Sequence, residues 1–176
     1  MKSFFTLLLF VSISTLTFSQ ENRYGVRGGL NVSNLDFTPD PTFTNSHRNG
    51  FAFGGFVDYG VSDSFSILVE LQYSAEGGKA DELKADYIQI PIMFRFALTD
   101  KLTFGAGPMA SLKTWKNNDG FSTFAFSGIG GLEYMITDEL FIDARYSYGI
   151  TNILDKDLTT VEAKNSNIQF GFGIKI

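Results

Sequence analysis

The residues best suited to chemistry lie around His47, which is the only histidine of the chain. Ser46 precedes it directly, and Asp40 lies a few residues earlier in the same polar segment. A histidine can act as the base for a serine hydroxyl when a carboxylate orients its ring. Proximity in a polar segment does not establish such a hydrogen-bonded set. We therefore expect no catalytic residues and no enzymatic activity.

A second group of ionisable residues contains four cations and four anions, which recur at alternate positions of apolar-rich segments. The group consists of Arg27, Asp58, Glu70, Arg95, Glu133, Asp143, Arg145 and Lys175. Paired carboxylates can act as acid and base, and a ring of charges can line a narrow pore. Because positive and negative charges are equal in number, ion pairing among them is favoured over a catalytic carboxylate pair and over a charged pore. We predict a structural charge network.

The sequence predicts no metal site and no cofactor. It contains no cysteine, which excludes disulfides and thiolate metal sites. Two glycine-rich stretches, Gly28–Gly29 and Gly128–Gly131, superficially resemble phosphate-binding loops. Both lie within alternating segments that no helix follows, so they lack the context of that motif.

The elements that must position these charges are marked by a turn that occurs three times. Its copies are 61–65, 98–102 and 136–140, and their aspartates, Asp63, Asp100 and Asp138, lie 37 and 38 residues apart. Each turn is flanked by about ten residues that alternate between apolar and small or polar side chains. This repeat predicts a meander of β-hairpins.

The alternation predicts eight strands that close into one antiparallel up-and-down transmembrane β-barrel of the outer-membrane type. Their expected bounds are Arg23–Ser33, Gly50–Val61, Phe65–Ser74, Asp86–Leu98, Leu102–Lys113, Ser122–Ile136, Leu140–Ile150 and Asn167–Ile176. Strands of ten or more residues exceed the five or six that are most common in soluble sheets, and they match the length of a tilted strand that crosses a bilayer. The eight charges would then point inward.

Two other arrangements of the same strands would also bury one face. A soluble sandwich would need solvated polar faces, whereas the polar faces here carry glycine, serine and charges suited to burial. A soluble barrel of the lipocalin type would need the inverse assignment, with its apolar face inside.

Connection lengths predict the orientation of the barrel. Three connections are the short turns, and the others, near 34–49, 75–85, 114–121 and 151–166, are longer and polar. Outer-membrane barrels have short periplasmic turns and longer external loops. Aromatic residues near strand ends would form interfacial girdles: Tyr24, Tyr59, Tyr73, Trp115, Tyr134 and Tyr148.

The N-terminal residues are typical of a secretory signal. One lysine is followed by an apolar run, and Thr17 and Ser19 fit the small positions of a cleavage site. We predict a signal peptide at 1–19 and a barrel domain at 20–176. Acidic residues outnumber basic ones by 19 to 14, which argues against a nucleic-acid partner.

Several segments resemble the small outer-membrane β-barrel proteins of Bacteroidetes, a porin-family group with a PorT-like branch. They are Tyr24–Asn31, Asp58–Tyr59, Asp86–Ile92, Gly105–Pro108 and Gly171–Ile176. The resemblance implies a location in the outer membrane, contact with its lipids and insertion by the barrel-assembly machinery. It implies no particular activity. One departure is the final residue, Ile176, where such barrels usually end on an aromatic side chain.

These observations predict a non-enzymatic barrel with a lumen plugged by salt bridges, which acts in envelope structure or in surface interaction through its external loops. The alternative is a narrow channel or a component of a secretion complex, as the PorT-like resemblance implies. A lipid-modifying or proteolytic barrel enzyme is a third hypothesis.

Overall fold

The computed structural model describes residues 22–114, 120–155 and 160–176. The expected signal peptide and Trp115 lie outside the described residues. Within these ranges, no helix is both long and apolar enough to cross a membrane.

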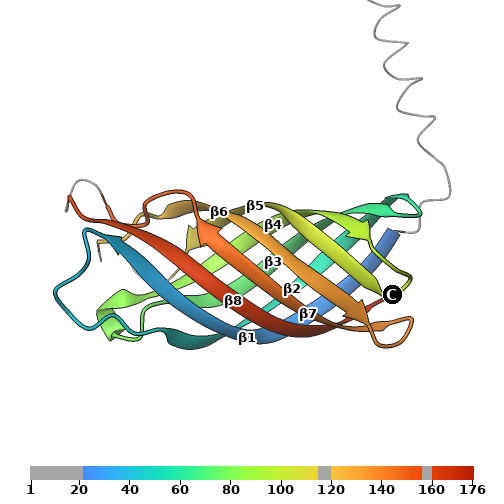
Figure 1. Cartoon of the computed structure of the whole chain (residues 1–176), viewed down its shortest axis with the longest axis horizontal. Coiled ribbons are helices and arrows are strands. Elements are labelled where there is room, and N and C mark those ends of the chain that lie inside the picture. The colour runs from blue at the N-terminus through green and yellow to red at the C-terminus, as the bar shows by residue number, and fades with distance from the viewer. Residues whose placement is uncertain (1–21, 115–119, 156–159) are drawn as a thin grey trace, which may run out of the picture.

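Eight antiparallel strands form a closed barrel in which each strand pairs with its neighbours in the sequence and β1 pairs with β8 (Figure 1). The strands are β1 (Asn22–Thr38), β2 (Arg48–Ser62), β3 (Phe65–Gly77), β4 (Lys84–Ala97), β5 (Leu102–Lys113), β6 (Phe124–Met135), β7 (Leu140–Gly149) and β8 (Glu162–Lys175). A single helical turn, η1 (Asp81–Leu83), precedes β4. The predicted fold class is confirmed.

Several strand ends differ from the prediction at the long-loop end of the barrel. β1 continues to Thr38, β3 continues to Gly77, and β8 begins at Glu162. In the β1 extension Asp36 points outward and Leu35 points inward, so the outward-facing apolar alternation that marks the rest of the strand is lost. The backbone ladder nevertheless continues, and Thr38 pairs with Glu162.

The three repeated turns, the start of β1 and the C-terminus lie together at the right of Figure 1, and the longer connections lie at the opposite end of the barrel. In two of the turns a threonine hydroxyl organises the backbone. The hydroxyl of Thr99 accepts a hydrogen bond from the amide of Leu102 at 3.0 Å, and that of Thr137 accepts one from Leu140 at 2.9 Å. Such local bonds favour a tight turn over a continued strand.

The apolar face of the strands points outward, as predicted for a surface in contact with lipid. Along β8, Phe170 is 59% exposed and Phe172 is 68% exposed, while the intervening positions face the lumen. β4 and β7 show the same alternation. The lipocalin-type alternative, which required an apolar interior, is therefore wrong for this chain.

The connections at the long-loop end are joined in pairs. The amide of Lys79 donates to the carbonyl of Ser46 at 3.0 Å, linking the β3–β4 connection to the β1–β2 connection. The amide of Ser122 donates to the carbonyl of Ile153 at 2.8 Å, linking the β5–β6 connection to the β7–β8 connection. These contacts draw the strand ends together above the lumen.

Candidate functional site in the barrel lumen

All eight predicted charges lie on inward positions, and each residue is no more than 7% exposed. They form two clusters, each with two positive and two negative side chains. The mid-barrel cluster consists of Arg27, Glu70, Asp143 and Arg145. The short-turn cluster consists of Asp58, Arg95, Glu133 and Lys175.

The mid-barrel cluster is centred on a two-pronged ion pair that crosses from β1 to β7. The Nε and Nη2 atoms of Arg27 donate to the two carboxylate oxygens of Asp143 at 2.5 and 2.6 Å. Arg145 donates to Glu70 at 2.6 Å and lies 3.6 Å from Asp143. A fork-shaped guanidinium matches a carboxylate in this geometry, which makes these the stronger kind of ionic hydrogen bond.

Glycine leaves room for this pair. A Cβ atom at Gly171 would lie only 2.7 Å from Nη2 of Arg27 and would displace the guanidinium. The small residue on β8 is therefore part of how the cluster fits inside an eight-stranded barrel, whose interior is just wide enough for side chains.

The short-turn cluster closes into a ring of contacts. Arg95 donates to Asp58 at 2.5 Å and also to Glu133. Lys175 donates to Glu133 at 2.6 Å and to Asp58 at 3.3 Å. Its ammonium also lies 5.3 Å from the ring centre of Phe141, within the range of a cation–π contact.

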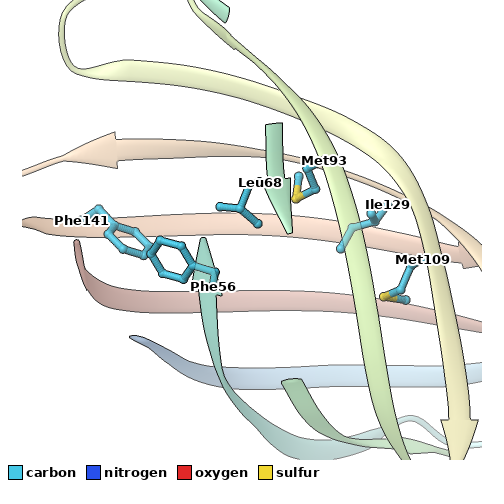
Figure 2. Close-up of a cluster of buried hydrophobic side chains, with 6 residues drawn as sticks. All are labelled: Phe56, Leu68, Met93, Met109, Ile129 and Phe141. Atoms are coloured by element: carbon cyan, nitrogen blue, oxygen red, sulfur yellow. The ribbon is translucent and has the colours of Figure 1, made fainter. Parts of the chain in front are cut away.

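Apolar side chains fill the lumen beside the two clusters. This apolar layer consists of Phe56, Leu68, Met93, Met109, Ile129 and Phe141 (Figure 2). Figure 2 shows the rings of Phe56 and Phe141 next to each other, with their centres 5.8 Å apart in an edge-to-face arrangement. On β2 and β4 a residue of this layer lies two positions before Asp58 and Arg95. The short-turn cluster therefore borders the apolar layer, and the ammonium of Lys175 lies near the rings of both Phe56 and Phe141.

A second apolar group closes the lumen at the long-loop end. We call it the apolar cap, and it consists of Leu35, Phe121, Ala125, Ile153 and Ala163. Phe37, Leu83 and Leu154 pack against it. The apolar alternation does not predict this cap, because most of its members lie in segments whose composition is typical of loops.

A cavity of about 1090 Å³ lies at the short-turn end. We call it the vestibule. Asp58, Arg95, Glu133 and Lys175 line it, together with turn residues such as Asp63 and Asp100. The short-turn cluster thus faces this cavity.

The predicted interfacial tyrosines lie on outward positions. Tyr24, Tyr59 and Tyr134 are near the short-turn end and are 45–53% exposed. Tyr73 and Tyr148 are near the long-loop end, and the hydroxyl of Tyr73 donates to Asp86 at 3.0 Å.

His47 is exposed and pairs through its backbone with Gly78. In the part of the chain that the structure describes, no hydrogen bond joins its side chain to Ser46 or Asp40. The same residues contain no group of three His, Cys, Asp or Glu side chains that could share a metal ion.

Sequence reasoning missed one buried charge, Glu76, which is 1% exposed near the outer end of β3. It had been assigned to the loop 75–85. Continuing the alternation of β3 from Glu70 through Gln72 and Ser74 would have placed Glu76 on the inward face. The four donors around its carboxylate come from Ser74, Gln89, Asn165 and Asn167.

Comparisons with known proteins agree with this geometry. The model of the outer membrane protein β-barrel domain family matches residues 3–175. No curated protein matches the sequence at a significant level.

Similar solved structures include Ail, the attachment invasion locus protein of Yersinia pestis, and the Neisserial surface protein A. Ail is 14% identical, with a TM-score of 0.56, covering 89% of this chain and 99% of its own. The Neisserial protein is 16% identical, with a TM-score of 0.58, covering 87% of this chain and 97% of its own. At this level of identity the likeness is one of fold. With a family match over almost its whole length and a closed eight-stranded barrel, the chain belongs to the outer membrane protein β-barrel domain family, which places it in the outer membrane.

Proposed function

We propose that this protein is a non-enzymatic outer-membrane barrel with a lumen closed to ions, which acts in envelope structure or surface interaction through its external loops. The observation that carries the proposal is the filled lumen. A buried charge is costly unless it is paired and hydrogen-bonded, and each of the eight predicted charges has an oppositely charged partner.

The apolar cap supports the same proposal from the other end. Leu35 and Ile153 are at most 1% exposed, and the loops above them are joined by backbone hydrogen bonds. A route for hydrated ions would have to pass this cap, the two charged clusters and the apolar layer. The surface left for interaction is then formed by the long loops.

A specific observation favours one alternative, a narrow channel or a secretion-complex component of the PorT-like type. The vestibule opens a charged, mixed-sign surface at the short-turn end, where a periplasmic partner could bind. Under either hypothesis we expect contact with outer-membrane lipids and insertion by the barrel-assembly machinery, as the family resemblance implies. Under either hypothesis we also expect cleavage of a signal peptide after Ser19.

An enzymatic barrel is less well supported. The exposed His47 has no hydrogen bond to Ser46 or Asp40 among the described residues, so no base is oriented for a hydroxyl nucleophile. In the two clusters, each carboxylate is also engaged by a guanidinium or ammonium group.

The closed lumen predicts no stable unitary conductance for the wild-type protein in planar bilayers. Reproducible single-channel steps would contradict it. If steps occurred, D58N and D138N would locate the path. Asp58 lines the vestibule, whereas Asp138 lies in the β6–β7 turn and does not line it, so a change of ion selectivity in D58N alone would establish conduction through the lumen.

The orientation predicts which loops are reached from outside. Because the chain has no cysteine, T42C and D100C each introduce a single reactive thiol, in the β1–β2 connection and in the β4–β5 turn. A membrane-impermeant maleimide added to intact cells is expected to label T42C, and to label D100C only after the outer membrane is permeabilised. The reverse pattern would place the long loops in the periplasm.

A further inference from the structure

The carboxylate of Glu76 differs from the other buried charges in its partners. Its Oε1 atom accepts hydrogen bonds from Ser74 at 2.7 Å, from Asn167 at 2.9 Å and from Gln89 at 3.0 Å. Its Oε2 atom accepts one from Asn165. All four donors are neutral. We call Glu76 and these four residues the amide layer.

Within the described ranges, no cationic side chain contacts this carboxylate. Arg48 comes near, but its Nη1 atom donates to the backbone carbonyl of Glu76 at 2.5 Å and to the carboxylate of Asp86 at 2.9 Å. The positive charge of Arg48 is therefore paired with Asp86. An ionised Glu76 therefore has no cationic partner among the described side chains, in a site where an unpaired charge is costly.

The amide layer and the neighbouring Asn31, whose Nδ2 atom donates to Ser74 at 2.8 Å, contain carbonyl oxygens that lack donors. The Oδ1 atoms of Asn31, Asn165 and Asn167 are buried, and none has a hydrogen-bond partner among the described residues. These three residues are at most 8% exposed. Buried acceptors without donors are rare in folded proteins, and each calls for a bound species or a cost in stability.

The unpartnered oxygens of Asn165 and Asn167 lie close to the carboxylate by covalent geometry. Each of these residues donates its amide nitrogen to Glu76, and the oxygen of an amide lies only about 2.3 Å from its nitrogen. The Asn167 oxygen is therefore within about 5 Å of a Glu76 oxygen. Two oxygens bound to one hard cation are separated by at most about 5 Å, and by less when they lie on the same side of the ion.

We propose that the amide layer binds a monovalent hard cation, such as Na⁺ or K⁺. The carboxylate of Glu76 and the carboxamide oxygens of Asn165 and Asn167 would bind it, with Asn31 beside them. One positive charge matches the single uncompensated negative charge, whereas Ca²⁺ sites usually contain several carboxylates. The site is independent of whether the lumen conducts.

Two simpler occupants satisfy only part of the layer. A proton on Glu76 would neutralise the charge, but a carboxylic acid has a single O–H donor, so at most one of the three carboxamide oxygens would gain a partner. A water molecule would donate to two of these oxygens but would leave the charge uncompensated. A cation meets both requirements.

The test measures urea unfolding of the detergent-solubilised wild-type protein at constant pH and ionic strength, in NaCl, in KCl and in choline chloride. Choline is too large for the site. Binding to the folded state alone lowers the unfolding equilibrium constant about tenfold for each tenfold rise in cation concentration above Kd. NaCl or KCl is therefore expected to stabilise the protein over choline chloride, and E76Q is expected to lose this difference.

E70Q is the matched control, because Glu70 is also buried in the lumen but is paired with Arg145. It is expected to be less stable than the wild type and to keep the dependence on the identity of the cation. The proposal is overturned if the wild type is equally stable in all three salts, or if E76Q keeps the difference. A response to pH without a response to the cation would assign the site to a proton.

A direct measurement keeps the proposal testable if E76Q does not fold. Crystals of the wild-type barrel grown in NaCl, with RbCl as the heavier analogue of KCl, are expected to show a bound ion. It should be coordinated by oxygens of Glu76, Asn165 and Asn167, with an anomalous signal for rubidium. A site that contains only water in both salts would overturn the proposal.

Discussion

Replacing Asp143 by asparagine is expected to lower the free energy of unfolding by about 3–5 kcal/mol. The substitution keeps the shape of the side chain but removes its charge. Arg27, whose side chain is fully buried, then loses the carboxylate that binds it at 2.5 and 2.6 Å, and Arg145 loses its second anionic neighbour. The measurement is urea unfolding in detergent micelles or lipid vesicles.

D81N is the matched control, because Asp81 pairs with Lys84 at 2.5 Å on the exposed surface. An exposed pair contributes at most about 1 kcal/mol, so the same chemical change should have little effect there. The double variant R27Q/D143N should be less destabilised than the sum of its single variants, because it leaves no guanidinium of Arg27 unpaired. Equal stability of D143N and D81N would contradict the buried network.

Replacing Phe170 by arginine is expected to destabilise the barrel in a bilayer by about 2–4 kcal/mol. Phe170 lies on the outward face of β8, well inside the apolar belt, and pairs with Leu30 on β1 and Ala144 on β7. An arginine there would place its charge in the hydrocarbon region. The measurement is reversible urea unfolding in phospholipid vesicles.

L140R is the control for this prediction. Leu140 also faces outward, but it is the first residue of β7 and lies beside a turn. Near the interface the cost of an arginine falls to about 0–1 kcal/mol. Similar losses for both variants would mean that the outward face does not span a bilayer as proposed.

The two predictions address opposite faces of the same strands. On β7, Asp143 points into the lumen and Ala144 points outward. The outward face contacts lipid, where a charge is costly, and the eight predicted inward charges all lie in compensated pairs. This division supports our proposal that the loops, and not the strands, form the interaction surface of the protein.

The eight strands were predictable because a barrel in lipid imposes strict alternation along each strand. β5 has the predicted bounds, Leu102–Lys113. The prediction ended β1 at Ser33 because the apolar alternation stops there, whereas the strand continues to Thr38. The alternation of apolar side chains indicates which part of a strand contacts lipid, whereas backbone hydrogen bonding determines where the strand ends.

The alternation of side chains between the two faces of each strand also predicted that the eight charges would face inward. It could not determine their partners. Arg27 and Asp143 are separated by 116 positions and lie on β1 and β7, which are not adjacent strands. Their contact depends on the closure of the barrel, on its stagger and on the space beside Gly171.

By itself, the sequence determined the number of strands, the face that residues within the predicted strands occupy and the end of the barrel that carries the short turns, because these follow from local periodicity. Only the tertiary structure decided which charges pair across the lumen, that an apolar cap closes its outer end, and that Glu76 is buried among neutral donors. These features depend on side chains from distant strands that meet within a narrow interior, and no local pattern encodes such a meeting.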